Sequence, residues 1–276
     1  MRAIAIINQK GGVGKTTTAV NLSAALAKTG QRVCLIDMDP QAHATLHLGV
    51  TPSSEHPSIY DVLTGRAKLA DARQIVGENL SVVGSHIDLA AAEVELAGVV
   101  GREVILRDAL AEDQGEFDYL FIDCPPSLGV LTLNALSAVE EVFLPLQPHF
   151  LALHGLSKLL QTIELVKRRL NPQLRLSGVM YCMFESATRL ASEVTRDVDE
   201  FFAKSRESSA PWSQVQMFQT RIRRNIRLAE APSFGQSIFQ YSAESNGADD
   251  YRRLAAEILG IIDDHSVTDV KASVVA

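Results

Sequence analysis

Ala-Ile-Ala-Ile-Ile-Asn-Gln-Lys-Gly-Gly-Val-Gly-Lys-Thr-Thr-Thr occupies residues 3 to 18 and predicts a strand, a glycine loop and a helix in succession. The apolar run Ala3–Ile7 is rich in β-branched residues, which is typical of a short buried strand. After Gly14 a helical pattern begins and continues to Gly30. Glycines let backbone N–H groups approach a phosphate closely, and the helix N-terminus adds partial positive charge. The stretch therefore predicts a phosphate-binding loop.

The residues at the join between loop and helix carry the chemistry of this prediction. Lys15 is expected to reach the β- and γ-phosphates of a nucleotide, and the Thr16 hydroxyl is expected to bind Mg²⁺. The alternative is an ordinary strand-to-helix connection that happens to carry a lysine. The glycine spacing, the Lys-Thr pair and the strand–helix context all favour the phosphate site.

The loop departs from the general pattern G-x-x-x-x-G-K-[ST], because Gln9 stands where the first glycine belongs. A second lysine, Lys10, precedes Lys15 by five residues. This form resembles the deviant Walker A box of the ParA/MinD family of dimerising ATPases. The resemblance implies that Lys10 reaches across a dimer interface to the partner's nucleotide, whereas the alternative is a solvated loop lysine. It also implies ATP and Mg²⁺ as cofactors, bound through Lys10, Gly11, Gly12, Val13, Gly14, Lys15, Thr16 and Thr17.

Two strand-like runs end in acidic residues. Arg32–Met38 leads into Asp39, and Tyr119-Leu-Phe-Ile-Asp-Cys-Pro-Pro delivers Asp123. Open α/β sheets bind ligands at the carboxyl ends of their strands. In P-loop enzymes an aspartate at that position holds Mg²⁺. The first run resembles the family's D-x-D-P-Q segment, which implies that Asp39 places the attacking water; helix capping or surface charge is the alternative. The expected metal-site residues are Thr16, Asp39 and Asp123, and the expected catalytic residues are Lys10, Lys15 and Asp39.

Residues 220 to 232 contain four arginines, although the whole chain has a net charge of −7. The run resembles the family block I-P-R-N-V-R-L-(S/A)-E-A-P, with Arg223 in place of the proline, and the family's block lies near both the nucleotide and DNA. Arginine binds phosphate through paired hydrogen bonds, independently of base sequence. Expected DNA contacts are Arg221, Arg223, Arg224 and Arg227. The resemblance also implies base contacts from Met183, Arg224 and Asn225. The alternatives are a core Met-Phe pair at 183–184 and ion pairs of the arginines with Glu230, Asp249 and Asp250.

Composition sets the remaining bounds. The chain has 276 residues, of which 46% are hydrophobic and 21% are charged, as in an ordinary protein with a sizeable core. No apolar run approaches the roughly 20 residues of a membrane span, and the predicted strand begins too early for a signal peptide. The three cysteines, which lie far apart, are expected to be buried thiols. His43 and His47 are spaced for one helix face but lack further metal ligands, so they are interpreted as polar residues beside the pocket.

Strand and helix patterns alternate along the chain. They predict an α/β fold with a doubly wound, mostly parallel sheet flanked by helices, of the P-loop NTPase type. Residues 1–264 are expected to form a single ATPase domain, followed by a disordered tail at 265–276. The tail lacks the basic amphipathic helix of MinD-type relatives, so no membrane contact is expected and the location is expected to be cytoplasmic, on the nucleoid.

The resemblance to ParA covers residues 2 to about 262. It implies an ATPase that dimerises on MgATP, binds DNA without sequence preference and is released on hydrolysis, driving chromosome or plasmid segregation. A ParB-like partner is expected to accelerate slow turnover. One alternative is the same switch positioning a protein assembly as its cargo. Another is a P-loop enzyme that phosphorylates a small carboxylate substrate, against which Lys10 and the arginine cluster argue.

Overall fold

The computed structural model describes residues 1–53, 55–149, 152–185 and 189–261. An eight-stranded sheet runs through them in the order β3-β4-β2-β5-β1-β6-β7-β8, and every neighbouring pair is parallel except β3 with β4. This confirms the predicted fold class. The strands are β1 (Arg2–Ile6), β2 (Val33–Asp37), β3 (Arg73–Gly77), β4 (Leu80–Val83), β5 (Tyr119–Asp123), β6 (Glu141–Leu146), β7 (Arg175–Tyr181) and β8 (Gln216–Met217).

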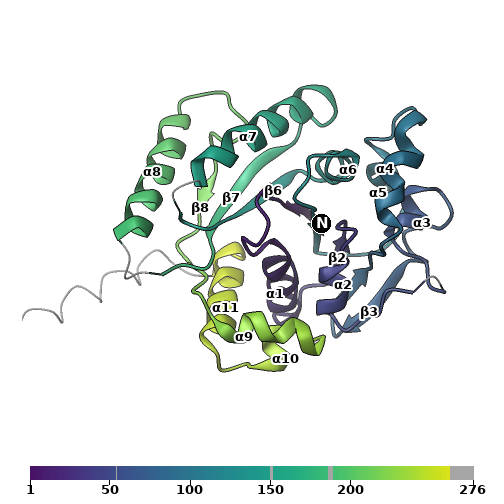
Figure 1. Ribbon diagram of the computed structural model, residues 1–276, viewed down its shortest axis with the longest axis horizontal. Coiled ribbons are helices and arrows are strands. Elements are labelled where there is room, and N and C mark those ends of the chain that lie inside the picture. The colour runs from purple at the N-terminus through teal and green to yellow at the C-terminus, as the bar shows by residue number, and fades with distance from the viewer. Residues whose placement is uncertain (54, 150–151, 186–188, 262–276) are drawn as a thin grey trace, which may run out of the picture.

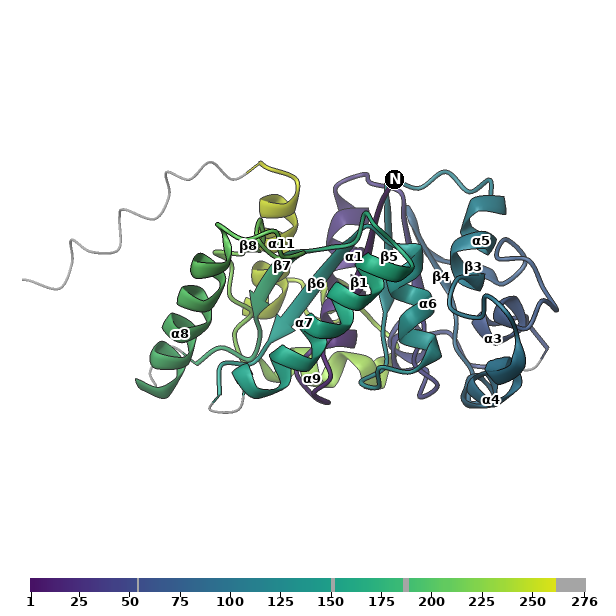
Figure 2. The ribbon, with the colours of Figure 1, turned by 90° about the horizontal axis from the view of Figure 1, so that it is seen from above.

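Helices cover both faces of the sheet (Figures 1 and 2). One hydrophobic cluster joins the sheet to α3–α8, and a second joins its other face to α1, α2, α10 and α11. The helices are α1 (Lys15–Lys28), α2 (His43–His47), α3 (Ile59–Leu63), α4 (Leu89–Glu95), α5 (Ile105–Glu112), α6 (Val130–Ala138), α7 (Ala152–Arg169), α8 (Arg189–Ser205), α9 (Ile226–Glu230), α10 (Ile238–Tyr241) and α11 (Asn246–Ile258), with short 3₁₀ turns η1 (Leu96–Gly98) and η2 (Ala231–Phe234).

The interior strands β2 and β5 are buried at every residue. Strands covered by helices on both faces read as continuous apolar runs, which explains why the sequence predicts them well. Their parallel register sets Asp37 opposite Asp123, and Asp123 also lies opposite Ile6 at the end of β1. The two carboxylates and the start of the P-loop therefore meet at the carboxyl ends of these parallel strands.

Some elements differ from the prediction. Strand β3 and helix α6 were not expected, and α11 ends at Ile258. Gly260, with a φ of +70°, terminates that helix in the left-handed conformation that glycine adopts without strain. Helix α1 begins at Lys15, directly after the glycine loop. The expected disordered tail, 265–276, lies outside the described residues.

Candidate functional site

The P-loop connects the end of β1 to the first turn of α1. Gly12 and Gly14 have φ of +72° and +94°, a backbone conformation that residues with a side chain rarely adopt. A Cβ added to Gly11 or Gly12 would meet no atom within 4 Å, so the loop leaves open space where a phosphate would lie. Val13 is buried and fixes the loop to the core.

The two lysines of the loop lie in different surroundings. Lys15 is 7% exposed, and its ammonium donates to the carbonyl of Lys10 at 3.2 Å. Burial lowers the pKa of Lys15, while the negative charges of Asp123 and Asp39 oppose that shift. Lys10 is exposed, and its ammonium contacts the ring Nε2 of His149 in the loop after β6. In this chain Lys10 thus contacts a residue of its own subunit.

Asn8 connects this loop to the sheet. Its side-chain amide donates to the carbonyl of Pro145 in β6 at 2.8 Å, and its oxygen accepts the N–H of Lys10 at 3.0 Å. The backbone on which Lys10 stands is therefore fixed even though its side chain is exposed.

Asp123 is a fully buried carboxylate, and neither of its oxygens has a hydrogen-bond partner among the described residues. Burial, together with the neighbouring charge of Asp37, raises its pKa well above the usual value for aspartate. The Thr16 hydroxyl and the ammonium of Lys15 act in the opposite direction. An unpaired buried carboxylate is costly unless a cation or donor satisfies it. Carboxylate and hydroxyl oxygens are ligands that Mg²⁺ prefers, so Asp123 and Thr16 fit a magnesium ion shared with nucleotide phosphates.

Asp37, which the sequence reasoning did not assign to the site, organises the adjacent helix α2. Its buried carboxylate accepts the N–H of Thr45 at 2.9 Å, the Thr45 hydroxyl at 2.7 Å and the N–H of Asp39 at 3.1 Å. Burial raises the pKa of Asp37 to about 6. The Thr45 hydroxyl in turn accepts the N–H of Ser85. Asp37 therefore holds in place the segment that carries Asp39. The Asp39 side chain is half-buried, and its carboxylate accepts the backbone N–H of Gln41.

One of the residues predicted to contact the base, Met183, lies close to the P-loop, just after β7. Met183 is half-buried, with a left-handed φ of +51°. It follows Cys182, whose Cβ lies 3.5 Å from the position of a Cβ on Gly14. Asn225 caps α9 by accepting the N–H of Arg227. The contact of these residues with a base stays a prediction.

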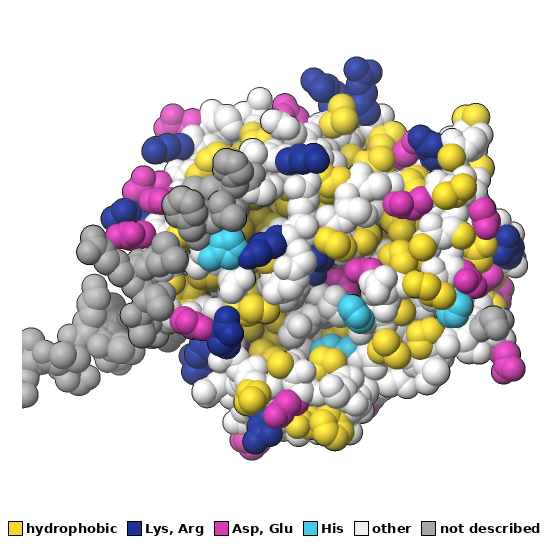
Figure 3. Space-filling view, in the orientation of Figure 1, with side chains coloured by type: hydrophobic (Ala, Val, Ile, Leu, Met, Phe, Trp, Pro, Cys, Tyr) yellow, Lys and Arg dark blue, Asp and Glu magenta, His cyan; other side chains and the backbone are white. Residues whose placement is uncertain are grey.

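Three of the four arginines predicted to bind DNA pair with carboxylates. Arg223 binds Asp250, Arg227 binds Glu230, and Arg224 binds Glu185, while Arg221 lies over the ring of Phe184. Arg223 also lies 3.6 Å from Asp249, so the alternative partners Asp250, Asp249 and Glu230 are all engaged. On the face in Figure 3, several Lys and Arg side chains lie beside acidic side chains rather than forming one continuous basic surface.

His43 and His47 do not form a metal site with other side chains, because no group of three or more His, Cys, Asp or Glu in the described part of the chain could hold a metal ion. His47 is 1% exposed and its Nε2 has no hydrogen-bond partner there. Burial lowers its pKa to about 4, and a hydrogen bond with the backbone of Gln236 opposes this shift only partly. The histidine is therefore a neutral core residue between α2 and η2.

Replacing His47 with glutamine should make the protein less sensitive to acid. The pKa of His47 is about 4 when folded and 6.5 in an unperturbed histidine, so protonation favours unfolding as pH falls through that range. We expect the wild-type free energy of unfolding to fall by about 2 kcal/mol more between pH 7 and pH 5 than that of His47→Gln. Urea unfolding at both pH values measures this, with His56→Gln in an exposed loop as control. If the wild type and His47→Gln lost the same free energy of unfolding between pH 7 and pH 5, His47 would not be buried in its neutral form.

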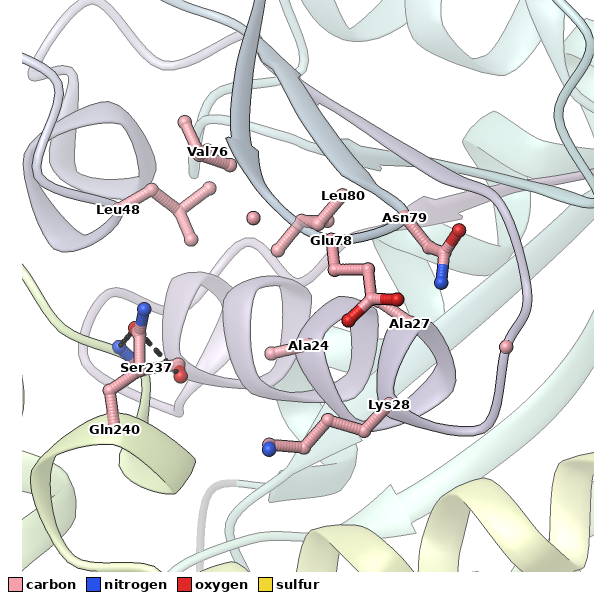
Figure 4. A pocket seen from close by; sticks show the side chains of 12 residues that line it. Ala24, Ala27, Lys28, Leu48, Val76, Glu78, Asn79, Leu80, Ser237 and Gln240 are labelled. Carbon is pink, nitrogen blue, oxygen red and sulfur yellow. Dashed lines mark hydrogen bonds between the residues drawn. The ribbon is translucent and has the colours of Figure 1, made fainter.

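A separate hollow of about 370 Å³ lies between the C-terminal half of α1, the β3–β4 hairpin and α10 (Figure 4). Apolar side chains such as Leu48 and Val76 line one part, and Lys28 and Glu78 line another. Its polar residues Ser237 and Gln240 bond to one another in a capping box. Because Lys28 ends the helix that Lys15 begins, this hollow is distinct from the P-loop site.

Comparison with known proteins shows that this chain has close relatives in sequence and in structure. Residues 1–176 match a family model described as an AAA domain. The chain is 44% identical over 258 residues to the sporulation initiation inhibitor protein Soj of Bacillus subtilis, covering 93% of this chain and 98% of that protein. It is 44% identical over 259 residues to the chromosome partitioning protein ParA of Myxococcus xanthus, covering 94% and 88%.

Among solved structures, the chain resembles cobyrinic acid a,c-diamide synthase of Mycobacterium smegmatis with bound ATP analogue and magnesium. The TM-score is 0.78 at 37% identity, covering 94% of each chain. Within the described residues, no helix has the length and apolar character needed to cross a membrane.

Proposed function

Because the chain belongs to the ParA/Soj family of chromosome-partitioning ATPases, we propose that it dimerises on MgATP, binds DNA without sequence preference and leaves the DNA on hydrolysis. The observation that carries the nucleotide part is the buried, unpaired carboxylate of Asp123 beside Lys15 and Thr16. We also propose that residues 1–264 act as one ATPase domain, and that a ParB-like partner accelerates turnover.

The proposed chemistry is positioning and electrostatic stabilisation, as phosphoryl transfer requires. Lys15 and the loop N–H groups would hold the phosphates, and Asp123 with Thr16 would hold Mg²⁺. The ion, when bound, supplies positive charge to the phosphate oxygens. Asp39, whose backbone Asp37 fixes, would orient the attacking water.

Lys10 would supply charge to the partner's nucleotide across the dimer interface. Its exposure and the fixed backbone beneath it support a side chain that changes partners without moving the loop. Since its ammonium contacts His149 of the same chain, the side chain must move away from His149 when the dimer forms.

Binding to a random-sequence duplex, measured with MgATP and with MgADP over a salt series, tests the proposal. We expect ATP-dependent binding that weakens steeply with salt, because phosphate contacts release counterions. Arg224→Glu should weaken it further. Equal binding in both nucleotides, or none, would contradict the DNA part and favour a protein cargo.

A carboxylate-activating enzyme is the second candidate, because a solved structure 37% identical to this chain is named as a diamide synthase. Turnover that needs a small carboxylate substrate and is indifferent to DNA would favour it. Turnover of ATP without any such molecule would count against it.

Asp39→Ala should keep ATP-dependent dimerisation but lower ATP hydrolysis by about 100-fold or more, since a positioned acid or base contributes about 10²–10⁴ in rate. Sedimentation with ATP and a phosphate-release assay measure the two properties. Asp108→Ala, which removes an exposed carboxylate on α5, is the matched control. Normal hydrolysis by Asp39→Ala would place the water-orienting role elsewhere.

A further inference from the structure

Residues 219–224, here called the arginine segment, are held against α11 by two carboxylates. Glu257 accepts the N–H of Gln219 at 2.7 Å and the N–H of Thr220 at 3.0 Å. Asp250, seven residues earlier and so on the same side of the helix, holds the other end of the segment. Backbone groups of the segment are thus bound by side chains of α11.

Asp250 binds Arg223 in two ways. Its carboxylate accepts the backbone N–H of Arg223 at 2.9 Å, and it accepts the guanidinium from Nε at 2.9 Å and from Nη2 at 2.6 Å. Asp250 is 4% exposed, so its charge is satisfied mainly by this arginine. The pair raises the pKa of Arg223. A proline, as in the family block, would lack both the N–H and the guanidinium.

The neighbouring arginines are held more loosely. Arg224 pairs with Glu185 at 2.6 Å, but both side chains are at least half exposed. Arg221 is exposed and its guanidinium lies 4.4 Å from the centre of the Phe184 ring. Exposed ion pairs contribute little free energy, so a phosphate can replace Glu185 far more readily than it can replace Asp250.

The same turn of α11 also contacts the helix that follows the P-loop. The hydroxyl of Tyr251, next to Asp250, lies 3.1 Å from the Thr18 hydroxyl on α1. Tyr251 is fully buried. Adjacent residues of α11 therefore join the nucleotide-binding helix to the arginine segment.

We propose that Asp250 is a positioning residue for DNA binding, and that Arg223 is the anchor it holds rather than a phosphate contact. The anchor presents Arg221 and Arg224 outward. This inference rests on the proposed DNA-binding function.

Asp250→Asn separates positioning from simple charge neutralisation, because the two predict opposite signs. If Asp250 only cancelled the charge of Arg223, its removal would strengthen DNA binding. We expect instead that ATP-dependent affinity for a random duplex falls about 10-fold, although the protein loses one negative charge. Asp249→Asn is the matched control: it removes the same charge from the next residue, 3.6 Å from Arg223, without a bond to the backbone. Its affinity should be unchanged or slightly higher.

Arg223→Ala provides a second readout. Deleting a side chain that binds a DNA phosphate lowers the slope of log affinity against log salt by about one, whereas deleting an anchor that touches no phosphate leaves the slope unchanged. We expect an unchanged slope, and a double variant Arg223→Ala/Asp250→Asn no weaker than either single variant. Tighter binding by Asp250→Asn, or a reduced slope in Arg223→Ala, would overturn the inference.

Hydrogen exchange keeps failure of the inference distinguishable from failure of the proposed function. Wild-type protein that does not bind DNA with ATP contradicts the proposed function, and with it the positioning role. Whether Asp250 anchors the segment is then decided separately: amides of residues 219–224 should exchange faster in Asp250→Asn than in Asp249→Asn. Equal exchange rates would show that the anchor itself is absent, whatever the protein binds.

Discussion

Lys15→Ala is expected to weaken ATP binding by about 100-fold or more, equivalent to about 2.7 kcal/mol. The wild-type ammonium is 7% exposed and lies in the P-loop near Asp123 and Asp39. Its removal deletes the cation that phosphates would meet and leaves those carboxylates to repel them. Titration calorimetry with ATP and Mg²⁺ measures the loss.

Lys28→Ala is the control for this change, because Lys28 is an exposed lysine at the other end of the same helix. It should bind ATP like the wild type. A thermal melt of each variant checks that the helix is intact. Tight ATP binding by folded Lys15→Ala would remove the central assignment of the site.

Asp123→Asn is expected to change stability and activity in opposite directions. Without nucleotide or Mg²⁺, the neutral side chain should raise the free energy of unfolding by roughly 1–3 kcal/mol, because it replaces an unsatisfied buried carboxylate. Hydrolysis should fall by about 100-fold or more, because the residue proposed to hold Mg²⁺ loses its charge. Urea unfolding and phosphate release measure the two effects.

The stabilisation should depend on pH with a defined sign. The folded-state pKa of Asp123 is raised above its ordinary value of 3.8. Ionisation therefore favours the unfolded chain, and wild-type stability is lost as pH rises above that value. The advantage of Asp123→Asn should be larger at pH 8 than at pH 4.

Asp118→Asn, which changes the residue directly before β5, is the contrasting control. Hydrogen bonds from Arg32 lower the pKa of Asp118, so neutralising it should bring no gain in stability. A destabilised, fully active Asp123→Asn protein would contradict both the burial argument and the metal assignment.

The sequence predicted the parts of the fold that are buried on both faces. Strands β2 and β5 read as apolar runs ending in acids, and the structure has both. Strand β3 was missed because it lies at the sheet edge, pairs antiparallel only with β4 and shows no continuous apolar run; Ile75 at its centre is 88% exposed. Helix α6 is apolar on nearly all sides, so it shows no helical periodicity.

The site was predictable where its residues lie within one motif. Lys15 and Thr16 are recognised from local spacing, and the fold brings Asp123 to them as expected. Contacts between residues far apart in sequence were predictable only in part. The contact of Lys10 with His149 leaves no periodic or motif signal, because it depends on where two separate loops meet. Pairing of the arginines with Asp250 was an alternative on charge alone, but the bond of Asp250 to the backbone N–H of Arg223 was not predictable, because it depends on how α11 packs against that segment.

The three cysteines bear on how this protein can be labelled. Cys34, Cys124 and Cys182 are all buried free thiols, and burial raises the pKa of each, to about 11 for Cys34 and about 12 for Cys182. A buried thiol that stays protonated reacts slowly with maleimides and disulfide reagents. A single cysteine introduced on the surface would therefore take a fluorophore selectively in the native background. The folded chain can thus carry a dye on one chosen residue without first being stripped of its own thiols.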